Sequence, residues 1–201
     1  EITQKHGILL IFDEVITGFG RLGHAFAAER YGVLPDMITF AKGITNGAAP
    51  MGGVIVRDTL YDAFMTGPEH VIELCHGYTY SAHPLACAAG IATLDIYRDE
   101  KLFEHAKALE PKFADAAMSL RKEPNVVDIR TVGLTAGIDL APKAEGPGKR
   151  GFECLQRGFH DLDIMMRIAS DTIELTPPLI VSEDQIGEII DKVAKVIRAV
   201  A

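Results

Sequence analysis

The chain has 201 residues, of which 48% are hydrophobic and 24% are charged, and its formal net charge is −8. Such a composition supplies a full hydrophobic core. The acidic balance, without any basic run, excludes an electrostatic surface for nucleic acid. No apolar stretch approaches the roughly 18 residues of a membrane span. We therefore expect a soluble globular chain with no nucleic-acid partner and no membrane partner.

The three cysteines are Cys75, Cys87 and Cys154, which are widely spaced and form no C-x-x-C pair. This usage argues against a disulfide framework and against a structural zinc site, and it favours a reducing, cytoplasmic compartment. The chain starts at Glu1 rather than at Met and enters an apolar run within seven residues. We therefore expect that an upstream part of the protein precedes it.

The first hundred residues are predicted to be α/β. Strand candidates and one intervening helix candidate are, in chain order, 8–12, the helix 26–31, 37–41 and 52–56. The first run does not alternate and ends in Asp13, as in a central strand covered on both faces. Its distance from the second run suits a right-handed parallel crossover. That crossover would place Asp13 and Lys42 side by side at the strand ends.

The second half is predicted to be α+β. Its candidate elements are a helix over 84–97, a helix over 102–120 with Pro111 as a kink or break, strands over 126–130 and 134–140, a helix near 152–159, and strands near 165 and 173. The last helix starts with Ser182 and Gln185 as a capping box. The change in character predicts one domain over residues 1–100 and a second over 101–201.

Two residues at predicted strand ends carry the clearest chemistry. Lys42 stands where a strand delivers a residue into a crevice, and a desolvated lysine amine there can form a Schiff base with an aldehyde. Asp13 at the neighbouring end could keep a pyridine nitrogen protonated, which makes pyridoxal phosphate an electron sink. A solvated strand-end lysine and a turn or capping acid are the alternatives that these residues alone leave open.

Three further segments are candidates for ligand binding. Gly18 to Gly23 spells G-x-G-x-x-G, but five residues separate it from the strand, so turns with positive φ are favoured over a dinucleotide loop. Thr79 or Ser81 could bind a phosphate at a helix start, and the same segment fits a capped loop. Arg167 lies among apolar residues, where it needs a substrate carboxylate or an internal acidic partner.

Four stretches taken together resemble the class III aminotransferases in sequence, order and spacing. They are FDEVITGFGR (12–21), FAKGITNG (40–47), HGYTYSAHP (76–84) and MRIASDTIELTPPL (166–179). The details of 41–54 and 165–172 are most similar to ω-amino acid:pyruvate aminotransferases that accept β-alanine. The resemblance covers essentially the whole chain. It implies the C-terminal part of a fold type I enzyme: a portion of the large domain that binds pyridoxal phosphate, over 1–100, and the small domain over 101–201.

The resemblance also implies roles for individual residues. Lys42 matches the Schiff-base lysine that shuttles a proton, and Asp13 matches the acid paired with the pyridine nitrogen. Val15 matches the apolar residue against the ring face. Thr79 matches the hydroxyl that reaches the phosphate of the partner subunit's cofactor, with Tyr78 near the same phosphate.

In the same comparison, Arg167 matches the arginine that binds the substrate carboxylate. The implied reaction is a ping-pong transfer of an ω-amine to the 2-oxo acid pyruvate, in a homodimer or tetramer whose active site is shared. Family members are longer, so the N-terminal half of the enzyme is expected to complete the site. The alternatives are another class III activity, on 4-aminobutyrate, another ω-amine or an amino-aldehyde, and an inactive fragment that serves as a structural module.

Overall fold

The computed structural model describes residues 1–70 and 76–201, so Cys75 lies outside the described residues. The chain divides into two compact units, which are unit 1 (Glu1–Gly20 and His24–Leu102) and unit 2 (Arg21–Gly23 and Phe103–Ala201). Within the described ranges, no helix has the length and apolar character needed to cross a membrane.

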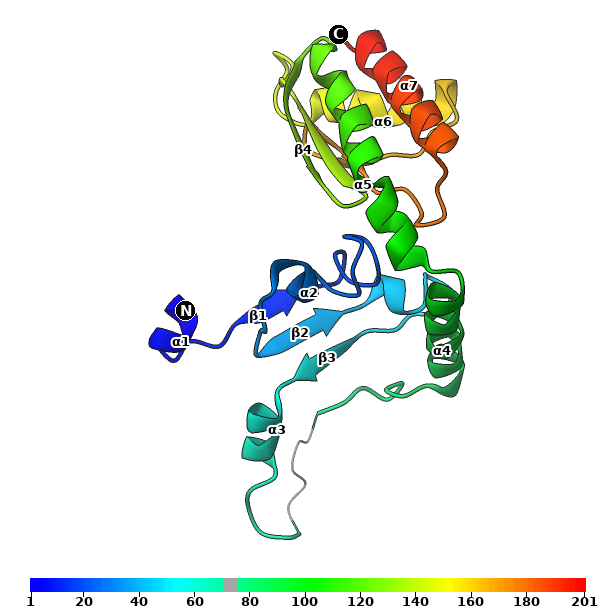
Figure 1. Ribbon diagram of the computed structural model, residues 1–201. Coiled ribbons are helices and arrows are strands. Elements are labelled where there is room, and N and C mark those ends of the chain that lie inside the picture. Colours follow the sequence, from blue (N-terminus) through cyan, green and yellow to red (C-terminus); the bar gives the residue numbers. More distant parts are fainter. Residues whose placement is uncertain (71–75) are drawn as a thin grey trace. The chain divides into compact units, whose positions relative to one another are not determined.

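Unit 1 contains a three-stranded sheet in the order β1-β2-β3 (Figure 1). Its elements are α1 (Ile2–Lys5), β1 (Ile11–Asp13), α2 (Ala27–Tyr31), β2 (Met37–Phe40), the 3₁₀ turn η1 (Lys42–Ile44), β3 (Gly53–Val56), α3 (Asp58–Phe64) and α4 (Pro84–Asp99). β1 and β2 are parallel, and β3 is antiparallel to β2. The parallel pairing predicted for the first two strands is confirmed.

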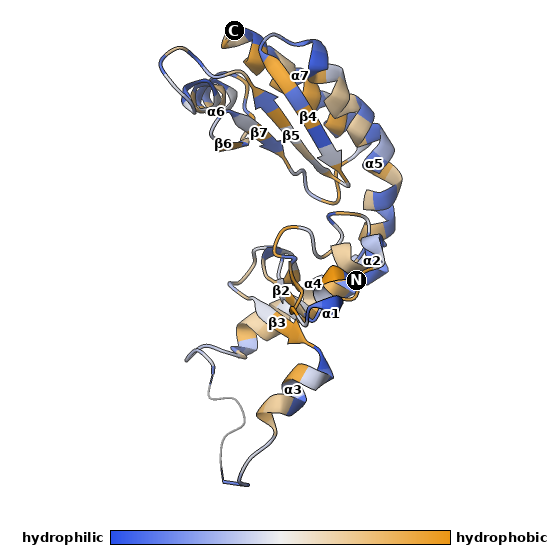
Figure 2. Ribbon diagram, turned by 90° about the vertical axis from the view of Figure 1, so that its left-hand side faces the viewer, coloured by the Kyte–Doolittle hydropathy of each residue, from blue (hydrophilic) through white to orange (hydrophobic). Residues whose placement is uncertain are grey.

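The covering of β1 differs from the expectation. Ile8, Leu9 and Ile11 are each more than half exposed, although their apolar run predicted a strand covered on both faces. In the described part of the chain β1 pairs with β2 alone, so it is an edge strand of its sheet. β3, hydrophobic in Figure 2, also exposes Val54 and Ile55. The apolar side chains of β1 and β3 are thus only partly covered by the described residues of this chain.

Unit 2 contains a four-stranded antiparallel sheet in the order β4-β5-β7-β6. Its elements are α5 (Leu102–Met118), η2 (Ser119–Lys122), β4 (Val126–Val132), β5 (Thr135–Leu140), α6 (Lys149–Asp161), β6 (Arg167–Ala169), β7 (Thr172–Leu175) and α7 (Glu183–Ala199). Pro111 lies inside α5 and does not end it. The core joins these elements through fully buried side chains such as Phe113, Ile138 and Val193.

The capping box predicted for the last helix is confirmed. Ser182 Oγ accepts a hydrogen bond from the Gln185 amide, and Gln185 Oε1 accepts one from the Ser182 amide. The two bonds satisfy backbone donors that an α-helix leaves unpaired at its start. α7 therefore begins where its sequence indicates, and it packs an apolar face on unit 2.

The hairpin formed by β6 and β7 is fastened to α6 through Asp171. The nearly buried Asp171 carboxylate accepts hydrogen bonds from the amides of Gly148, at 2.6 Å, and Gly151, at 2.9 Å. These amides belong to the start of α6, where a negative charge is favourable. The hairpin that carries Arg167 thus has a fixed position on its own unit.

Candidate active site

Asp13 and Lys42 lie at the same edge of the unit 1 sheet. Asp13 is the last residue of β1 and stands in register with Thr39 of β2. Lys42 follows the end of β2 by two residues and opens η1. Because the two strands are parallel, their carboxyl ends bring an acid and an amine to one edge, as expected from the sequence.

The Asp13 carboxylate is exposed and is held by two donors. Thr39 Oγ1 donates a hydrogen bond to Asp13 Oδ1 at 3.0 Å, and the Val15 amide donates to the same oxygen at 3.2 Å. One donor comes from the neighbouring strand and the other from the turn that follows Asp13. The acid is therefore oriented while it stays open to a ligand.

The residue after Asp13 anchors the adjoining loop. Glu14 is 1% exposed, and its carboxylate accepts hydrogen bonds from the Thr17 hydroxyl and from the amides of Ala27 and Ala28 at the start of α2. The Glu14 amide donates to the Thr39 carbonyl at 2.9 Å. A buried carboxylate needs such donors, so Glu14 fixes the path of the chain beyond Asp13.

Lys42 has an unusual backbone conformation. Its φ is +47°, in the left-handed region, which costs a residue other than glycine about 1–2 kcal/mol. The turn is closed by hydrogen bonds from the Ile44 amide to the Ala41 carbonyl and from the Thr45 amide to the Lys42 carbonyl. The side chain of Lys42 is exposed. The amine is therefore accessible, whereas its backbone is constrained.

The glycine-rich segment after β1 folds on itself. The Gly18 amide donates to the Glu14 carbonyl and the Gly20 amide donates to the His24 carbonyl. A Cβ atom at Gly18 would lie 2.8 Å from the Glu14 carbonyl oxygen. These amides are engaged inside the loop, and the following helix, α2, has only five residues. The geometry thus favours glycines that allow tight turns over a dinucleotide loop.

Thr79 and Tyr78 lie in an exposed turn ahead of α4. The Tyr78 amide donates to Ser81 Oγ, and the Ser81 amide donates to the Tyr78 carbonyl, each at 2.9 Å. The start of α4 is capped by His83, whose Nδ1 accepts from the Leu85 amide. The segment is thus a loop that ends in a histidine helix cap. Thr79 lies between Tyr78 and Ser81, the two residues whose hydrogen bond closes the turn.

Arg167 belongs to unit 2 and has an acidic partner. Its Nε lies 2.8 Å from Glu174 Oε2 on the adjacent strand, and its side chain is 63% exposed. The expected apolar surroundings are not found, because side chains alternate along a strand and the buried one here is Met166. The internal salt bridge, one of the two readings left open, is the one that the structure shows.

Sequence reasoning missed Thr39 and Glu14 as supports of Asp13. Thr39 could have been found from the parallel pairing, because residues in register on neighbouring strands lie side by side. The bonds from Glu14 to α2 join residues 13 and 14 positions apart, across a loop without a periodic pattern. No sequence signal marks those contacts.

Residues 1–197 match the family described as aminotransferase class-III. An omega-aminotransferase of Caulobacter vibrioides is 52% identical over 196 residues, covering 98% of this chain and 44% of that protein. A beta-alanine–pyruvate aminotransferase of Pseudomonas aeruginosa is 44% identical, covering 100% and 45%. An (S)-enantioselective omega-transaminase of Thermomicrobium roseum has a TM-score of 0.90 and 37% identity, covering 99% and 45%.

The chain belongs to the class III aminotransferases. It has the mixed α/β fold of the solved transaminases, which are fold type I enzymes. Enzymes of this family depend on pyridoxal phosphate. The chain spans a little under half the length of the relatives that it matches.

Proposed function

We propose that the protein transfers the amino group of an ω-amino acid such as β-alanine to pyruvate, with pyridoxal phosphate as cofactor. Family membership and the names of the similar proteins support an aminotransferase of ω-amino acids. The observation that carries the proposal is the placement of Asp13 and Lys42 at the carboxyl ends of adjacent parallel strands.

The donor set at this edge fits the cofactor. Asp13 offers an oriented, exposed carboxylate for a pyridinium nitrogen, and Lys42 offers an exposed amine for an aldehyde. Val15 follows Asp13 and Glu14 and supplies an apolar surface for the ring. Thr79 and Tyr78 offer hydroxyl groups for a phosphate. When bound, pyridoxal phosphate supplies an aldehyde that condenses with amines and a protonated ring that withdraws electrons.

The residues of the chain then have distinct tasks. The Asp13 carboxylate keeps the proton on the ring nitrogen through a charge-assisted hydrogen bond, and Thr39 keeps that carboxylate in place. The Lys42 amine anchors the cofactor covalently. When the amine is free, it acts as the base that moves a proton from the substrate carbon bearing nitrogen.

Arg167 binds the carboxylate of the ω-amino acid or of pyruvate in this proposal. Its guanidinium forms one ion pair with Glu174 and stays largely exposed. A substrate carboxylate that accepts two hydrogen bonds from the guanidinium binds it more strongly than the single Nε contact with Glu174 does. Substrate binding therefore competes with Glu174 for Arg167.

We assign residues 1–100 to a portion of the large cofactor-binding domain and 101–201 to the small domain. The remainder of the large domain, provided by an N-terminal half of the same enzyme, would cover the exposed apolar residues of β1 and β3. We place the active site at the interface of a homodimer or tetramer, with Thr79 facing the partner's cofactor. The free thiols of Cys87 and Cys154 are compatible with the cytoplasm.

The proposal is tested by trapping the cofactor on the full-length protein. Incubation with pyridoxal phosphate and borohydride, followed by peptide mass mapping, should place a pyridoxyl group on Lys42. Lys42→Ala should lose it, while the exposed surface variant Lys195→Ala should retain it. Turnover of β-alanine with pyruvate should exceed turnover of 4-aminobutyrate with 2-oxoglutarate. A wild-type protein without the pyridoxyl group contradicts the proposal.

A further inference from the structure

The carbonyl after Lys42 is fixed by a tyrosine from a distant helix. Tyr97 of α4 donates a hydrogen bond from its hydroxyl to the Gly43 carbonyl at 2.7 Å, although 54 positions separate the two residues. Tyr97 is 7% exposed. A buried tyrosine hydroxyl needs such a partner, so this bond ties α4 to the lysine turn.

An aromatic side chain packs against the same glycine. A Cβ atom at Gly43 would lie 2.8 Å from the Cβ atom of Phe19, so the residue after Lys42 has no room for a side chain. Phe19 is 8% exposed, and its ring stacks on Tyr97 with centroids 6.4 Å apart and planes 24° apart. Its edge contact with Phe40, at 5.9 Å, reaches the last residue of β2.

Lys42 lies between these fixed neighbours in a strained conformation. Its φ of +47° persists only where the surroundings hold it, and Phe40 and Gly43, on either side of the Ala41–Lys42 pair, are both held by Phe19. We propose that Tyr97 and Phe19 are positioning residues that keep the Lys42 backbone in the left-handed turn and so aim its amine. This inference rests on the function proposed above for Lys42.

The direction of the amine depends on the backbone because the Lys42 side chain is exposed and receives little guidance from packing. The stem of a lysine rotates freely in water, so the Cα–Cβ direction is the main constraint on the volume that the amine reaches. Without the Tyr97 hydroxyl, the Gly43 carbonyl keeps the longer bond from the Asn46 amide, at 3.3 Å, but loses its shorter bond to α4, so the turn can relax toward a right-handed conformation. Tyr97 itself need not touch substrate or cofactor.

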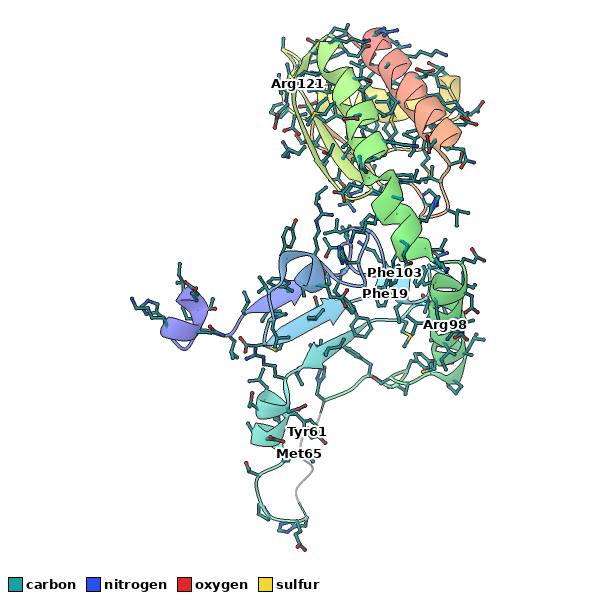
Figure 3. The ribbon with its side chains drawn as sticks, viewed as in Figure 1. Phe19, Tyr61, Met65, Arg98, Phe103 and Arg121 are labelled. Carbon is teal, nitrogen blue, oxygen red and sulfur yellow. The ribbon has the colours of Figure 1, made fainter. Side chains whose placement is uncertain are left out.

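The test compares Tyr97→Phe with Tyr61→Phe in the full-length protein. Tyr97→Phe removes the hydroxyl and keeps the ring that stacks on Phe19. Tyr61 lies on α3, away from Phe19, and is 53% exposed, so it is a matched control (Figure 3). The measurements are the rate at which a pyridoxyl group is fixed on Lys42, the kcat and KM for β-alanine, and the thermal unfolding midpoint.

For Tyr97→Phe we expect trapping on Lys42 and kcat each to fall about tenfold, the effect of roughly one charge-neutral hydrogen bond, with KM changed by less than about twofold. The unfolding midpoint should fall by only about 2–4 °C relative to Tyr61→Phe, as expected for the loss of one such bond. A variant that loses thermal stability but traps and turns over like the control overturns the inference. So does one that matches the control throughout.

Phe19→Leu gives a second, independent comparison. It removes the ring that stacks on Tyr97 and should slow trapping in the same direction; a trapping rate equal to that of Tyr61→Phe contradicts the inference. If Tyr97→Phe does not fold, this variant decides the question. Failure of the wild type to trap pyridoxal phosphate on Lys42 would overturn the proposed function itself. Normal trapping in the wild type with unaffected variants would overturn the positioning role alone.

Discussion

Thr39 Oγ1 donates a 3.0 Å hydrogen bond to Asp13 Oδ1 between the parallel strands β1 and β2. The same register places the Thr39 carbonyl where it accepts from the Glu14 amide. One residue of β2 therefore holds both the side chain of Asp13 and the backbone that follows it. In the proposed enzyme, this threonine sets the direction in which Asp13 meets the ring nitrogen.

Replacing Thr39 by Val should weaken cofactor binding. The change keeps the branched shape of the side chain and removes the donor to Asp13, and a hydrogen bond to a charged group contributes about 1.5–3 kcal/mol. Because Asp13 is exposed, water replaces part of the lost bond. We expect the dissociation constant of pyridoxal phosphate, measured by absorbance titration, to rise by about three- to tenfold. Thr39→Ser, which restores a hydroxyl, should stay near the wild type.

The sequence located Asp13 and Lys42 because both follow apolar runs, and the ends of parallel strands share an edge. It also located the start of α7, because the capping box joins residues only three positions apart. Patterns of this kind are local, or they follow from one pairing rule. They predict which elements form and which end of a strand carries chemistry.

The contacts that hold Lys42 and Arg167 in place could not be predicted from such patterns. The Tyr97 hydroxyl reaches the Gly43 carbonyl across 54 positions, and Tyr97 stands in a helix whose apolar pattern indicates only packing. The acidic partner of Arg167 depends on the register of the β6–β7 hairpin. Contacts of this kind follow from the tertiary arrangement, which local sequence patterns do not reveal residue by residue.

Glu14→Gln should destabilise the loop beyond Asp13. The backbone amides of Ala27 and Ala28 donate to separate oxygens of the Glu14 carboxylate. A glutamine side chain would replace one of these acceptor oxygens by an NH₂ group, which would then face a backbone N–H donor. We expect a loss of about 1–3 kcal/mol in the free energy of unfolding, measured in urea, together with faster hydrogen exchange at these two amides. Glu188→Gln, at an exposed glutamate that pairs with Lys192 on α7, should change stability by less than about 1 kcal/mol. Equal effects of the two variants would contradict this role for Glu14.

The ion pair between Glu123 and Arg198 should make the stability of unit 2 decrease as the pH is lowered. The two hydrogen bonds from Arg198, each 2.6 Å, hold the pKa of the Glu123 carboxyl below its ordinary value. The unfolded chain therefore binds this proton at a higher pH than the folded chain does. The stabilisation is complete above the ordinary glutamate pKa of about 4.3 and is lost as pH falls through the lower folded value.

The measurement is urea unfolding between neutral pH and pH 3 for the wild type and Arg198→Gln. The variant should show a shallower loss of stability below about pH 4.5, since the pKa of Glu123 is no longer lowered by the guanidinium. Arg121→Gln is a matched control, because the contact of 3.8 Å between Arg121 and Asp128 is long and exposed. Arg121 is labelled in Figure 3. A control slope as shallow as that of Arg198→Gln would show that Glu123 is not the source.

Two glycines on helices of unit 2 should respond oppositely to alanine. Gly187 on α7 is exposed and a Cβ atom there meets nothing within 4 Å, so Gly187→Ala should raise stability by about 0.5–1 kcal/mol through lower unfolded-state entropy. A Cβ atom at Gly151 on α6 would lie 2.1 Å from the Ser170 carbonyl oxygen. We expect Gly151→Ala to lower stability by about 1–3 kcal/mol, measured by urea unfolding.

The clash at Gly151 is hard to relieve because the β6–β7 hairpin, which contains Ser170, is hydrogen-bonded to the start of α6 at this point. Asp171, next to Ser170, accepts hydrogen bonds from the amides of Gly148 and Gly151 themselves. Moving the Ser170 carbonyl away from a new methyl group would stretch these bonds and leave a nearly buried carboxylate underpaired. The loss in Gly151→Ala should therefore be accompanied by faster hydrogen exchange at the start of α6, whereas Gly187→Ala should leave exchange there unchanged.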